Sequence, residues 1–121
     1  MRVCITSSGS NLDSDVDPRF GRTANFIIYD TDSGEFEVIE NKQRMDLPQG
    51  AGIQSATTIV DSEAKAVLTG NCGPKAFSVL DSCEIAAYVG LDGMTVREAL
   101  AKFQAGGLQP IADANVEGHW A

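Results

Sequence analysis

The amino-acid sequence predicts an α/β fold in which helices cover a mixed five-stranded sheet, with the element order βββαβαβα. Polar and apolar residues alternate in short runs over the first 40 residues, which is typical of strands. Beyond residue 50, apolar residues recur at helical spacing between short apolar runs. Helices that alternate with strands indicate parallel crossover units, so the expected architecture is a three-layer sandwich.

The first part of the chain predicts three strands, at residues 2–7, 26–30 and 35–40. The second and third are joined by the turn 31–34, in which Gly34 supplies a positive φ angle. These two strands are therefore expected to be antiparallel neighbours.

The second part predicts helices and strands in turn. Apolar stripes at helical spacing cover residues 53–60 and 76–83, and short apolar strands follow at 66–69 and 85–89. A third helix begins at the capping box 95–98. The two strands of this part are expected to lie parallel.

Composition predicts one acidic domain. The chain has 121 residues and a formal net charge of −8, which argues against binding to nucleic acid or to an anionic membrane. We expect one domain at 1–107 and a C-terminal surface tail at 108–121 without clear periodicity. No apolar run approaches the length of a membrane span and no signal peptide is visible, so we expect a cytoplasmic monomer.

Four loops are expected to share the edge of the sheet where parallel strands end: 7–25, 41–52, 70–74 and 90–94. Two of them carry glycines directly before a helix, where free N–H groups and the helix dipole favour an anion. These residues are Gly50 and Gly52 before the first helix and Gly70, Asn71, Cys72 and Gly73 before the second, with Lys75 beside them. The alternative is that the glycines serve packing alone.

The first of these loops contains an arginine cluster in an otherwise acidic chain. Its members are Arg19, Phe20, Gly21 and Arg22. Guanidinium donors and an apolar ring suit an anion with a large polarisable surface. The alternative is that the arginines neutralise the aspartates of residues 13–17.

The cysteine count restricts metal chemistry. Three cysteines and one histidine are too few for a four-cysteine or histidine-rich site. Cys4 and Cys83 fall on apolar stripes and are expected in the core. Cys72 precedes a helix, where the thiolate is favoured, so it is either a reactive or metal-contacting thiol or a plain loop residue. His119 lies in the tail with no oriented partner, and we expect no enzyme.

Four sequence blocks occur in a fixed order: Asp17-Pro-Arg-Phe-Gly-Arg22, Phe26-Ile-Ile-Tyr-Asp30, Gly50-Ala-Gly-Ile-Gln54 and Leu68-Thr-Gly-Asn-Cys-Gly-Pro74 with Ala76-Phe77. In these blocks the chain resembles the dinitrogenase iron-molybdenum cofactor biosynthesis family. Their order and spacing match to about residue 107. The resemblance implies a ribonuclease H-like fold and a role in binding or carrying metal–sulfur cofactors. The resemblance also implies a likeness to the small stand-alone members, which include a protein that holds a mixed molybdenum–copper sulfide cluster without ordinary covalent ligation.

The resemblance thus implies a cluster carrier. Its cargo would be a molybdenum–copper sulfide cluster or, as the alternative, iron-molybdenum cofactor or a precursor of it. The expected cluster-binding residues are Ser8, Arg19, Phe20, Gly21, Arg22, Gly50, Gly52, Gly70, Asn71, Cys72, Gly73 and Lys75, with Cys72 as a contact to Cu(I) or molybdenum. Many relatives have a histidine where this chain has Gln49, which puts direct ligation of iron-molybdenum cofactor in doubt there. The alternative function is a cofactor-free regulatory or interaction module of the same fold that docks an ATPase, a cofactor-assembly protein or another nitrogenase-related partner.

Overall fold

The computed structural model describes residues 1–42 and 50–115. Within them, the order of elements is the predicted βββαβαβα, and each strand begins and ends within a residue of its predicted position. The elements are β1 (Arg2–Ser7), β2 (Asn25–Asp30), β3 (Phe36–Glu40), α1 (Ala51–Asp61), β4 (Ala66–Leu68), α2 (Pro74–Ser82), β5 (Ala86–Tyr88) and α3 (Val96–Gln104). No helix in these two ranges has the length and apolar character needed to cross a membrane.

The five strands form one mixed sheet in the order β3-β2-β1-β4-β5. β2 is antiparallel to both of its neighbours, β1 and β3. β4 is parallel to β1 and to β5, as predicted for the two later strands. Four strands therefore end at the same edge of the sheet, which we call the rim. The assignment to the ribonuclease H-like folds stays a prediction.

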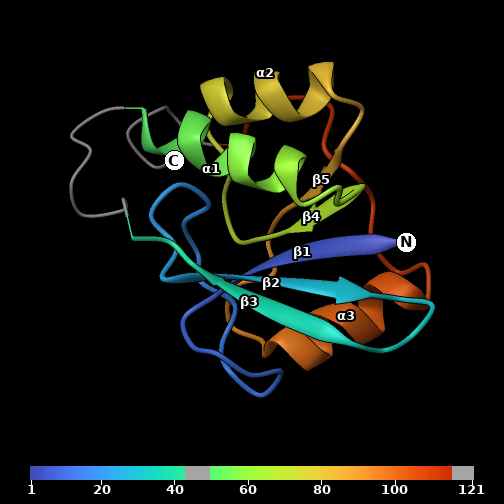
Figure 1. Ribbon diagram of the computed structural model, residues 1–121. Helices are drawn as coiled ribbons and strands as arrows, with labels where there is room; N and C mark the ends of the chain where they lie inside the picture. The colour runs from blue at the N-terminus through green and yellow to red at the C-terminus, as the bar shows by residue number, and fades with distance from the viewer. Residues whose placement is uncertain (43–49, 116–121) are drawn as a thin grey trace.

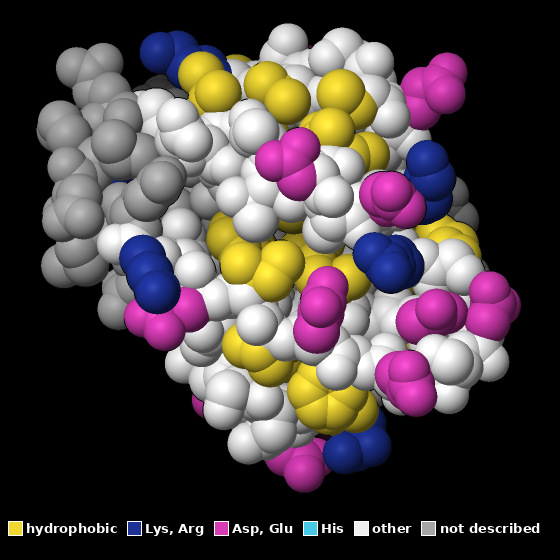
Figure 2. Space-filling view, in the orientation of Figure 1, with side chains coloured by type: hydrophobic (Ala, Val, Ile, Leu, Met, Phe, Trp, Pro, Cys, Tyr) yellow, Lys and Arg dark blue, Asp and Glu magenta, His cyan; other side chains and the backbone are white. Residues whose placement is uncertain are grey.

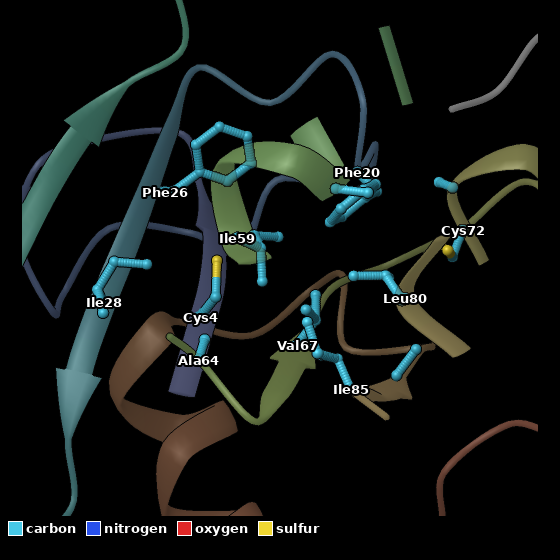
Figure 3. Packing of buried hydrophobic residues seen from close by; sticks show 13 residues of the cluster. Cys4, Phe20, Phe26, Ile28, Ile59, Ala64, Val67, Cys72, Leu80 and Ile85 are labelled. Atoms are coloured by element: carbon cyan, nitrogen blue, oxygen red, sulfur yellow. The ribbon is translucent and has the colours of Figure 1, made fainter. Parts of the chain in front are cut away.

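The sheet lies between two helical layers. α1 and α2 cover one face and α3 covers the other (Figure 1). Since side chains of a strand alternate between faces, Cys4 of β1 packs beneath α1 and α2 with Ile59 and Leu80, as Figure 3 shows, whereas Val3 and Ile5 pack on the α3 side. β1 is buried on both faces, and Cys4 is in the core as predicted.

The prediction that Cys83 belongs to the core is wrong, because its side chain is exposed. α2 ends at Ser82 and Cys83 is its C-cap. The next residue, Glu84, has a φ of 59°, which turns the chain away from the helical path. The buried stripe of α2 therefore stops at Leu80, one turn before the position that helical spacing had suggested.

The first loop of the rim, residues 8–24, is fixed to the α3 side of the sheet. Val16 forms a bridge with Ser7, and its N–H donates to the Met94 carbonyl at 2.9 Å. The first N–H groups of α3, on Val96 and Arg97, donate to loop carbonyls at 2.9 and 2.8 Å. The N-terminus of α3 is thus satisfied by the protein itself.

The capping box of α3 yields a test of the local sequence signal. The Thr95 hydroxyl accepts the Glu98 N–H at 3.1 Å, and the Glu98 carboxylate accepts the Thr95 N–H at 2.9 Å. We expect Thr95→Ala to lower the free energy of unfolding by about 1 kcal/mol, measured by urea denaturation. The control is Thr57→Ala in the exposed middle of α1, where alanine is at least as favourable. Equal losses of unfolding free energy in the two variants would contradict a stabilising role of the Thr95 cap.

Candidate functional site

Two predicted ligand loops meet at the rim. Arg19 and Asn71 form a parallel bridge, and the Asn71 side-chain amide donates to the Pro18 carbonyl at 3.0 Å. We call the two segments in contact, residues 17–20 and 69–71, the loop junction. The junction sets the backbone of the arginine cluster against the loop that leads into α2.

Gly70 is needed for this contact between loops. A Cβ atom at Gly70 would lie 2.6 Å from the Pro18 Cα and 2.8 Å from its carbonyl oxygen. The group that the absence of a side chain lets approach is the protein's own backbone, so packing explains this glycine, and a ligand contact by Gly70 stays a prediction. Gly70 therefore belongs to the support of the site.

Asp17 holds the loop in shape beside the junction. Its carboxylate accepts the N–H groups of Arg19 and Ala24, both at 3.1 Å. Beneath it the buried hydroxyl of Thr6 lies 2.8 Å from the Asp17 carbonyl oxygen and 2.8 Å from the Thr69 hydroxyl. These bonds connect the loop to the ends of β1 and β4, so the backbone position of Arg19 is well determined.

Phe20 faces the core rather than a ligand. It is 0 % exposed and packs edge-to-face on Phe26 with ring centroids 6.4 Å apart (Figure 3). Its N–H donates to the Asn71 carbonyl at 3.3 Å, and the next carbonyl, of Gly21, accepts the Ser55 hydroxyl of α1 at 3.3 Å. The prediction that Phe20 touches the cluster is therefore corrected: Phe20 anchors the loop in the core.

The polar and charged candidates of the first loop and of α2 differ in exposure. Arg19, Lys75 and Ser8 are exposed, and Arg22 is half-buried. The Ser8 N–H and hydroxyl both approach the Asp15 carbonyl, at 2.9 and 3.2 Å. On the face shown in Figure 2, acidic side chains gather toward the end of the sheet opposite the rim. On this face an anion near the rim therefore meets less repulsion than one at the opposite end of the sheet.

The N-termini of α1 and α2 both point to the rim (Figure 1) and both begin at glycine. Gly50 is the N-cap of α1 with a φ of 79°, and Gly73 is the N-cap of α2. Among the described residues neither helix has a side-chain cap or an acidic residue in its first turn, in contrast to α3 with Glu98. Two positive dipole ends therefore lack compensation from their own helices. Gly52 lies buried within the first turn of α1.

Burial and the helix N-terminus have opposite effects on the ionisation of Cys72. Its side chain is 0 % exposed, and burial raises the pKa of the thiol to about 12. A raised thiol pKa disfavours the thiolate at physiological pH and so opposes the effect of the helix N-terminus. In 1–42 and 50–115, no group of three or more His, Cys, Asp or Glu side chains is placed to hold a metal ion. A metal contact by Cys72 stays a prediction.

Asn115 is a site neighbour that sequence reasoning missed. Its side-chain oxygen accepts the Cys72 N–H at 2.7 Å, and its own N–H donates to the Cys72 carbonyl at 3.2 Å. Its side-chain amide donates to the Asn71 side-chain oxygen at 3.1 Å. The segment had no periodicity, so no pattern marked this residue. Gln49 and His119 lie outside the described residues.

Comparison with known proteins agrees with this architecture. The family model described as dinitrogenase iron-molybdenum cofactor matches residues 1–106. The apo form of the orange protein from Desulfovibrio gigas is 39% identical, with a TM-score of 0.93 over 95% of this chain and 96% of that one. A Thermotoga protein provisionally described as a NifB protein is 36% identical, with a TM-score of 0.82 over 97% and 98% of the two chains. An uncharacterized protein of Methanocaldococcus jannaschii is 33% identical over 73% of each chain.

The chain therefore belongs to the dinitrogenase iron-molybdenum cofactor family, as the sequence motifs indicated. The family match ends at residue 106, so segment 107–115, which includes Asn115, lies beyond it. The matched residues include the N-caps of α1 and α2, Gly50 and Gly73, and the loop junction.

The loop junction yields a stability prediction. We expect Gly70→Ala to lower the free energy of unfolding by about 1–3 kcal/mol, because the new methyl group displaces Pro18. Gly107→Ala is the matched control, since its Cβ would meet the Lys102 carbonyl at an ordinary 3.5 Å. Urea denaturation of both variants measures the difference, and equal stability would contradict the close contact.

The cysteines yield a labelling prediction. Because Cys4 and Cys72 are buried and Cys83 is exposed, a disulfide reagent at pH 8 should modify one thiol rapidly in the native protein. Burial raises the pKa of both Cys4 and Cys72, so the slow phase should persist as the pH is raised to 10. In Cys83→Ser the fast phase should vanish, and rapid labelling of Cys72 there would refute its burial.

Proposed function

We propose that the protein binds and carries an anionic molybdenum-containing metal–sulfide cluster at the rim, without catalysing a reaction. The observation that carries this proposal is the pair of helix N-termini, α1 and α2, that open on the rim without a side-chain cap or first-turn acid. Both the family and the orange protein among its structural relatives support cargo of this class.

The charges of the site support an anion as the ligand. A thiomolybdate unit carries negative charge on sulfur atoms, which accept hydrogen bonds from backbone N–H and guanidinium groups. The exposed Arg19 side chain starts from the loop junction, and Lys75 lies in the first turn of α2. The residues proposed for this role are the predicted ones, except that the buried Phe20 ring supports the loop from within the core.

The side-chain chemistry supports binding by charge and hydrogen bonds. Cys72 is buried, which raises the pKa of its thiol, and the described ranges hold no group of three or more metal-ligating side chains. The described residues thus fit a preformed anionic cluster better than they fit separate metal ions. A molybdenum–copper sulfide cluster is our first choice of cargo, and iron-molybdenum cofactor or a precursor is the second.

The cargo proposal is tested with tetrathiomolybdate and Cu(I). The wild-type protein mixed with both should acquire a chromophore that survives desalting, with molybdenum retained by elemental analysis. Arg19→Ala should weaken retention roughly tenfold, the effect of losing one charge-assisted hydrogen bond of about 1.5 kcal/mol. The matched control is Arg97→Ala, because that arginine pairs with Asp13 on the α3 side of the sheet.

Two outcomes would contradict parts of the proposal. Absence of molybdenum in the wild type would contradict the cluster itself, and specific binding of an ATPase or cofactor-assembly protein by the metal-free chain would then favour the regulatory module. Equal retention by the Arg19 and Arg97 variants would remove Arg19 from the site while leaving the cargo intact.

A further inference from the structure

The C-terminal segment 111–115 lies across the loop that leads into α2. The Ile111 N–H donates to the Ala87 carbonyl of β5 at 2.9 Å, which fastens the start of the segment to the edge of the sheet. At its other end Asn115 bonds to both backbone groups of Cys72 and to the side chain of Asn71. Both of these loop residues belong to the predicted anion site.

We propose that segment 111–115 is an internal competitor for the anion, and that Asn115 must leave the loop before the loop can bind its ligand fully. The proposal rests on the proposed function. Its central observation is the 2.7 Å bond from the Cys72 N–H to the Asn115 side-chain oxygen. The Asn115 oxygen is a neutral acceptor, and the Cys72 N–H that donates to it lies directly before the N-cap of α2. Without Asn115, a sulfur atom of an anionic cluster would accept this hydrogen bond instead.

Asn115 and a ligand cannot both accept the hydrogen bond of the Cys72 N–H. A backbone amide has one proton, so Cys72 cannot donate well to Asn115 and to a ligand at the same time. The second bond, from the Asn115 N–H to the Cys72 carbonyl, makes the contact reciprocal and holds the carboxamide in register. Ligand binding and docking of Asn115 are therefore mutually exclusive at this position.

The contact is also weak enough to be displaced. Asn115 is exposed and Ile111 is only half-buried, whereas the loop junction on the other side of the same loop is backed by the core residue Phe20. Few buried contacts and exposed hydrogen bonds are the marks of a segment that opens locally at low cost. The loop itself can thus stay in place while the segment leaves.

The test compares Asn115→Ala with Asn115→Asp. Alanine removes the competing acceptor, so the dissociation constant for tetrathiomolybdate, measured by optical titration at fixed ionic strength, should fall roughly two- to tenfold, the range expected for one net hydrogen bond. Aspartate places a negatively charged acceptor on the same N–H, so the dissociation constant should rise. Gln109→Ala, an exposed change in the same part of the chain, is the control and should match the wild type.

A second measurement needs no ligand. Hydrogen exchange of the Cys72 amide, followed by NMR, should accelerate in Asn115→Ala and stay unchanged in Gln109→Ala. Unchanged exchange in Asn115→Ala, or weaker tetrathiomolybdate binding in that variant, would overturn the proposal that segment 111–115 competes with the anion. Equal binding by the wild type and both Asn115 variants would overturn the proposed competition and leave the proposed function standing. Binding by none of the proteins would overturn the proposed function on which it rests.

Discussion

The loop junction is the constraint on which the rest of the rim depends. Pro18 lies so close to Gly70 that no side chain fits between them, and Asn71 bonds to the backbone on the opposite side. Phe20 then carries the first loop into the core. A loop of about 17 residues would otherwise cost considerable conformational entropy to hold in one shape. Once it is held, the arginine cluster has a determined place beside the N-terminus of α2.

The N-termini of α1, α2 and α3 differ in their caps, and this difference decides what each N-terminus can bind. α3 has a capping box and gives its first N–H groups to the first loop, so its positive end stabilises the fold. In the described structure α1 and α2 begin at Gly50 and Gly73 without such compensation. Helix dipole effects are limited to the first turn, so only groups at the rim benefit from them. A protein with a net charge of −8 can in this way bind an anion locally.

Local signals in the sequence predicted the elements well, because alternation, helical spacing and the capping box act over a few residues. The side chains of the site were predicted less well, because their roles depend on partners far along the chain. The sequence alone does not show that Phe20 packs on Phe26 in the core. Nor does it show that Gly70 contacts Pro18, which precedes it by 52 positions in the chain. Asn115 belongs to an aperiodic segment whose partner, Cys72, no local pattern could identify.

The burial of Cys72 bears on how the proposed carrier would release its cargo. A thiolate bond to copper or molybdenum would be strong and slow to break, whereas backbone amides and exposed cations each contribute little and are screened by salt. The Cys72 side chain is buried, while its N–H donates to the side-chain oxygen of the exposed Asn115. A site that binds through amides and charge, and that has its own acceptor ready to replace the ligand, favours exchange. Such exchange is what delivery to a recipient protein requires, because the same contacts must form and break without a change in covalent ligation.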